Sequence, residues 1–146
     1  MENFKAFYHR ADLSNYTENE YPVLTPIRSE SELLDYYRSN KDTYQFDRQY
    51  SGSTDMAGEV FAGNGLYDEA FFKNHFLLFI VLEEGSGSVR HKVESVTRVN
   101  GSLSVNIVRI IPEIGTCDMA QWHIIVVLDR AISDSDIDIG VSITGC

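Results

Sequence analysis

The sequence predicts an α+β fold in a single domain, 1–146, with a mostly antiparallel sheet of about five or more strands and two helices. Three observations predict it. Both helical patterns precede residue 76, strand patterns dominate after it, and 146 residues suffice to bury one hydrophobic core. We therefore divide the domain into a strand and helix part, 1–75, and a part of antiparallel strands, 76–146.

The N-terminal part contains two extended segments and one segment without a clear period. In FKAFYHR, 4–10, apolar and polar side chains alternate in part, which favours a strand. YPVLTPI, 21–27, is extended because each proline disfavours helix at the residue before it. For 42–66 we expect a short strand around GEVFA or a loop.

Two helices are expected in this part. The first spans 30–41, where Ser29 and Glu32 have the spacing of a capping box, in which each side chain satisfies an amide of the first turn. The second spans 67–75, where the carboxylate of Asp68 suits the positive end of the helix dipole.

The most apolar segments of the C-terminal part are FLLFIVLE, beginning at residue 76, and QWHIIVVLD, 121–129. Both are apolar at odd and even positions alike, which is typical of strands that are covered on both faces. We predict that 76–83 and 121–129 are central strands of one antiparallel sheet.

Three further strands surround them. In the strand expected over 88–96, one side carries Val89, His91 and Val93. The Asn-Gly pair within VNGS, 99–102, predicts a tight hairpin to the next strand, 103–111. The inward-facing positions of 103–111 change from odd to even along the strand, which predicts a bulge. DIDIGVSIT, 136–144, alternates cleanly and reads as an edge strand, whose carboxylates would discourage edge-to-edge pairing.

The stretch EEGSGSVRHKV, 83–93, combines serines, a histidine and glutamates. It lacks the G-x-S-x-G pattern of a nucleophile elbow, and Ser88 and His91 leave a strand on opposite faces. We therefore interpret Gly85 and Gly87 as residues of a hairpin turn between two strands.

Composition excludes several classes of function. The net charge is −10 and the 12 basic residues are scattered, so we expect no nucleic-acid partner. No apolar run approaches the ~18 residues of a membrane span, and the start lacks the pattern of a signal segment. Cys117 and Cys146 form neither a disulfide framework nor a metal knuckle.

The loop and strand start PEIGTCDMAQWH, 112–123, hold the only tryptophan. Trp122 is either a core residue or an anchor for a partner, because aromatic side chains dominate binding hot spots. An enzymatic alternative, a small hydrolase or metal-dependent enzyme, would use His91, His123 and Asp118, although no H-x-x-x-H or C-x-x-C spacing supports it.

LYDEAFFKNHFLLFIVLEEGSGSVRHKVESV and PEIGTCDMAQWHIIVVL resemble a group of uncharacterised proteins of Gram-positive gut bacteria, many of them exported or lipid-anchored. The order of strand, glycine turn, strand, hairpin, loop and apolar strand over roughly residues 72–146 is also similar to the C-terminal domain of PrcB, a subunit that associates with a surface subtilisin-like protease. The Thr-Gly-Gly-Tyr sequence common in that family is absent. A fold-level analogy to chagasin-type protease inhibitors lacks their Asn-Pro-Thr-Thr-Gly loop.

These resemblances imply a non-enzymatic interaction domain, extracellular or attached to the cell surface, with a protein partner such as a surface protease. Any export segment would then precede Met1. We expect no catalytic residue, metal or cofactor. The expected partner-binding residues lie in the two loops and the strand starts after them: Gly85, Ser86, Gly87, Ser88, Arg90, Thr116, Asp118 and Trp122. A chagasin-like protease inhibitor is a further alternative.

Overall fold

The computed structural model describes residues 4–12, 22–40, 67–84, 89–99, 102–114, 120–129 and 138–145. This part of the chain forms seven strands and two helices. Their bounds are β1 (Phe4–Asp12), β2 (Val23–Ile27), α1 (Glu30–Asn40), α3 (Glu69–Asn74), β3 (His75–Glu84), β4 (Arg90–Val99), β5 (Ser102–Ile110), β6 (Ala120–Asp129) and β7 (Asp138–Gly145).

The first sheet has the strand order β1-β6-β3-β2, and each neighbouring pair is antiparallel. The predicted central position of β3 and β6 is confirmed, because the two strands pair with each other from His75↔Asp129 to Glu84↔Ala120. Phe79 and Val126 are both 0% exposed. A strand that is apolar at every position requires cover on both faces, and this position in the fold supplies it.

The second sheet has the order β4-β5-β7. β4 and β5 form the predicted antiparallel hairpin, with Val99 opposite Ser102. β7 is the predicted edge strand, but it pairs with β5 in the parallel direction. The bulge was expected in 103–111 and lies instead in β4, where the register shifts between Val93 and Ser95.

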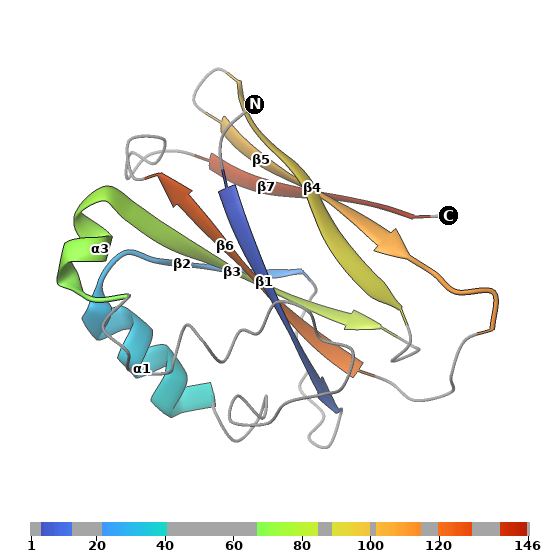
Figure 1. Ribbon diagram of the computed structural model, residues 1–146, viewed down its shortest axis with the longest axis horizontal. Helices are drawn as coiled ribbons and strands as arrows, with labels where there is room; N and C mark the ends of the chain where they lie inside the picture. Colours follow the sequence, from blue (N-terminus) through green and yellow to red (C-terminus); the bar gives the residue numbers. More distant parts are fainter. Residues whose placement is uncertain are drawn as a thin grey trace.

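The elements stack in three layers. Figure 1 shows the two helices on one side of the four-stranded sheet and the strands β4, β5 and β7 on its other side. Even-numbered residues of β3 and β6 pack in the core between the sheets, and odd-numbered residues pack against the helices. On the side of β1 and β4, the Tyr8 hydroxyl oxygen accepts a hydrogen bond of 2.9 Å from the Val93 N–H, next to the bulge.

Two expectations are therefore corrected. The strands form two sheets and not one, and EEGSGSVRHKV is not a hairpin, because β3 and β4 belong to different sheets. β3 already has β6 and β2 as neighbours, so neither of its edges remains for β4. The chain must therefore cross between layers after Glu84, and β4 covers the inner face of β3's sheet.

The helix starts agree with the sequence in part. The Ser29 hydroxyl accepts from the Glu32 N–H at 3.1 Å, as a capping box requires, but the Glu32 carboxylate accepts from the Arg28 N–H and not from Ser29. Asp68 caps α3 by accepting from the Phe71 N–H at 3.0 Å. Both helices thus begin where side-chain oxygens satisfy amides of the first turn.

Some predictions lie outside the described residues. These are the 42–66 segment, the glycines and serines of 85–88, Thr116, Asp118, and the two cysteines.

Candidate functional site

Two of the predicted partner-binding residues fall within the described part of the chain. Trp122 is only 3% exposed and packs in the core between the sheets, so its indole ring offers no surface to a partner. Arg90, the expected charged partner contact, is half-buried, and its guanidinium carbon lies 5.5 Å from the centroid of the Trp122 ring. Of the two readings of Trp122, the core residue is the one that the structure supports.

The two histidines of the enzymatic alternative do not meet. His91 lies on β4 and its ring contacts Trp122 between the sheets, whereas His123 faces α1 and its ring contacts Tyr36. The four-stranded sheet separates them. In the described ranges, no group of three or more histidine, cysteine or acidic side chains is placed to hold a metal ion.

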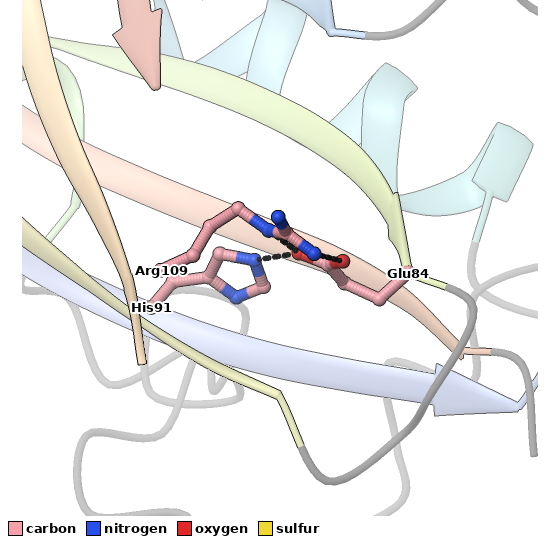
Figure 2. Close-up of polar contacts among 3 residues, drawn as sticks. All are labelled: Glu84, His91 and Arg109. Atoms are coloured by element: carbon pink, nitrogen blue, oxygen red, sulfur yellow. Dashed lines mark hydrogen bonds and ion pairs between the residues drawn. The ribbon is translucent and has the colours of Figure 1, made fainter. Parts of the chain in front are cut away.

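The structure instead brings Glu84, His91 and Arg109 together at one end of the sandwich. Figure 2 shows Glu84 reaching from the end of β3 to the two residues of the other sheet. Arg109 donates from Nε to Glu84 Oε2 at 2.8 Å and from Nη2 to Oε1 at 2.6 Å, a bidentate pair. His91 Nε2 lies 2.7 Å from Glu84 Oε2. We call these three residues the cross-sheet clamp.

Strand register explains why the clamp forms. His91 and Arg109 are direct partners across β4 and β5, so their side chains leave the same face. Glu84 follows Leu82 on the inner face of β3. The Glu84 and His91 side chains therefore point into an apolar interior, where an unpaired charge would be costly. Arg109 is partly exposed and pairs with Glu84 from the surface side.

The pKa values in the clamp follow from burial and charge. Burial alone raises the pKa of the Glu84 carboxyl, but the hydrogen bonds and charges of Arg109 and His91 outweigh it, so the net pKa lies below its usual value. Burial lowers the pKa of His91 below 6.5, more than the hydrogen bond and charge of Glu84 raise it, and the charges of Arg109 and Arg90 lower it further.

At neutral pH, Glu84 is therefore ionised and His91 is neutral. A carboxylate can only accept, so His91 Nε2 carries the proton and donates it to Glu84. The other ring nitrogen, Nδ1, is buried and has no hydrogen-bond partner within the described residues. Protonation of Nδ1 would bury a donor with no acceptor, which agrees with the lowered pKa of His91.

The clamp has the geometry of a base and its orienting acid, but not the access that catalysis needs. The His91 side chain is 0% exposed, and the Glu84 side chain is 6% exposed with both oxygens engaged. Arg109, whose side chain is 36% exposed, is the member of the clamp that reaches the surface. The arrangement thus suits the joining of two sheets better than proton transfer to a substrate.

A second buried polar group lies under α1. His9 and His123 are partners across β1 and β6, and the Tyr36 hydroxyl shares a hydrogen bond of 2.7 Å with His123 Nε2. Burial, with a contribution from the nearby His9, lowers the pKa of His123 to about 3. His123 is therefore neutral at neutral pH, and its role here is to hold α1 against the sheet.

A surface cleft of about 260 Å³ adjoins the clamp on the side of β2 and β7. Its lining residues are Pro22, Leu82, Glu83, Glu84, Arg109 and Ile143. Pro22, Leu82 and Ile143 form the apolar part of this lining, and Glu83, Glu84 and Arg109 form its charged part.

Sequence reasoning missed the clamp, although a signal for it existed. Each clamp residue occupies a position that alternation along its strand directs inward. Glu84 comes two residues after the buried Leu82, His91 lies between the buried Val89 and Val93, and Arg109 comes two residues after the buried Ile107. Polar residues at three inward positions require partners.

Comparisons with known proteins add no assignment: no family model, curated protein or solved structure matches the chain. Neither described helix has the length and apolar character that crossing a membrane requires.

Proposed function

We propose that this chain is a non-enzymatic protein-interaction domain, exported or attached to the cell surface, that uses the connection 85–88 to bind its partner. The observation that carries the proposal is the cross-sheet clamp. Glu84 and His91 stand on either side of this connection in the sequence, and a hydrogen bond of 2.7 Å ties them together. A binding loop gains affinity when its ends are held in place, because less conformational entropy is lost on binding.

A second observation favours a protein partner. Ile110, Ile111 and Ile114 are 51%, 44% and 87% exposed, at the end of β5 and shortly before Thr116 and Asp118 in the sequence. Large apolar side chains that gather on a surface are typical of interaction sites. Partner contacts at this segment would remove all three from water.

A protease is the partner class that we propose, on the resemblance to the PrcB C-terminal domain. The chagasin-like inhibitor is the variant of this proposal in which binding also blocks the protease. The enzymatic alternative would require a substrate to reach the buried His91.

The experiment measures binding of the immobilised protein to a panel of subtilisin-like and papain-like proteases by biolayer interferometry, together with residual protease activity. We expect one class to bind, and the double variant Ser86→Ala, Ser88→Ala to weaken binding at least tenfold at unchanged melting temperature. The matched control, Ser31→Ala with Ser39→Ala, changes two exposed serines of α1 and should bind as the parent does.

A second assay separates the enzymatic alternative. The protein is incubated with a panel of ester and peptide substrates at neutral pH. Turnover that His91→Ala abolishes would overturn the proposal, and so would a failure of every protease in the panel to bind.

A further inference from the structure

β7 forms one outer edge of the three-stranded sheet. It is the outer strand in the order β4-β5-β7, and among the described residues no strand pairs with its far edge. Such an edge presents a row of backbone donors and acceptors, which is a template for pairing with another extended chain.

The usual protections of an edge are few along this strand. The outward side chains Ser142 and Thr144 are exposed and uncharged, and β7 contains no proline and pairs with β5 without a register shift. The acidic residues expected to discourage pairing reach the strand only at its first residue, Asp138. As far as the described residues show, pairing is therefore open along 139–144.

Gly140 gives an independent reason to look for a partner. A glycine weakens a strand, since it has no side chain to pack. Gly140 is exposed, no atom lies within 4 Å of the position that a Cβ would take, and its φ is not in the left-handed region. The residue of β5 that pairs with Gly140 is Ser104, whose side chain is too small to cover the glycine. Within the fold described here, nothing requires glycine at this position.

The inner side of β7 has room for side chains of a partner. Ile139, Val141 and Ile143 pack against the core between the sheets but remain only partly buried. The cleft of about 260 Å³ lies beside Ile143. A strand added at this edge would direct every second side chain toward these residues, which is the way edge-binding domains obtain specificity.

We propose that the free edge of β7 binds an extended segment of a partner protein as a fourth, antiparallel strand of this sheet. Its inward positions carry aliphatic side chains that cover Ile139, Val141 and Ile143. Its outward position opposite Gly140 carries an aromatic ring, because cross-strand aromatic rings cover edge glycines. A lysine or arginine faces the Asp138 end. This inference rests on the proposed function, but it places a second contact apart from the connection 85–88.

The probe is a fluorescein-labelled peptide, Lys-Val-Thr-Val-Tyr-Val-Lys, which in antiparallel register sets tyrosine opposite Gly140. Its control has the same sequence with alternate backbone amides methylated, which removes donors and leaves the side chains. We expect the first peptide to bind, and the methylated peptide to bind at least tenfold more weakly, in fluorescence anisotropy.

Two protein variants complete the test. Gly140→Val should fold with unchanged or raised melting temperature, since the added side chain meets open space, and should weaken peptide binding at least fivefold. Thr144→Val, on the same face, is the control and should bind as the parent does. The loop variant Ser86→Ala, Ser88→Ala should also bind the peptide normally, so a failure of the 85–88 proposal would leave this result intact.

Three results would overturn the inference: no binding of the unmethylated peptide, equal binding of both peptides, or equal binding by Gly140→Val and the parent. Sedimentation that shows a dimer, dissociated by Gly140→Val, would overturn it too, because the occupant would then be a second copy of this chain.

Discussion

Removal of the Glu84 carboxylate should destabilise the fold through the loss of the cross-sheet clamp. Taking away one partner of a fully buried ion pair costs about 3–5 kcal/mol. The Glu84 side chain is 6% exposed, but that of Arg109 is 36% exposed, so water screens part of the interaction. We therefore expect Glu84→Ala to lower the free energy of unfolding by about 2–3 kcal/mol.

A double-mutant cycle isolates the pair itself. Glu84→Ala, Arg109→Ala and the double variant are unfolded with urea and followed by the fluorescence of Trp122, which is buried and whose ring centroid lies 5.4 Å from that of His91. Far-ultraviolet circular dichroism serves as a second probe. We expect a coupling energy of about 1–2 kcal/mol between the two sites. Effects that add within roughly 0.3 kcal/mol would refute the reasoning, because side chains in bidentate contact cannot act independently.

Three further predictions concern the cores and the surface. Burial lowers the pKa of His123 to about 3, so between pH 6.5 and about 3 the unfolded state binds a proton that the folded state does not. The free energy of unfolding should therefore fall as the pH is lowered through this window, by at most ~1.4 kcal/mol per pH unit. Urea unfolding at pH 7, 6, 5 and 4 should show a shallower fall for His123→Gln, and an equal fall would contradict the assignment. Phe79→Asp and Val126→Asp place a carboxylate at positions that are 0% exposed and should abolish cooperative melting, so parent-like melting would refute the central strand pair. Ile114→Asp should leave the melting temperature unchanged and weaken binding to the proposed protease partner. Leu34→Asp, also at an exposed apolar position but on α1, should leave binding intact, so equal losses in both variants would argue against the surface at Ile110, Ile111 and Ile114.

Local patterns predicted individual elements well. The doubly apolar runs around Phe79 and Val126 identify the central pair, because a strand that is apolar at every position can lie only where both of its faces are covered. Asn100 and Gly101 predict the β4–β5 hairpin, and Asp68 predicts the start of α3. Each of these signals acts within a few residues.

The partition into two sheets could not be predicted in the same way. Nothing near Gly85 distinguishes a hairpin from a crossover, since the outcome depends on β2 occupying the remaining edge of β3. The direction of β7 likewise depends on which strand it meets. The clamp is an intermediate case: the inward parity of Glu84 and Arg109 is visible in the sequence, but their meeting requires the two sheets to face each other.

Nitrogen-15 NMR of the His91 ring tests the clamp most directly. The geometry predicts a neutral imidazole at pH 7 with the proton on Nε2, bound to Glu84, and a titration below pH 6.5. In Glu84→Ala, the chemical shift of the His91 Nε2–H group should no longer be that of a hydrogen-bonded N–H. A proton on Nδ1, an imidazolium at pH 7, or an Nε2–H signal unchanged by Glu84→Ala would contradict the clamp on which the binding-loop proposal rests.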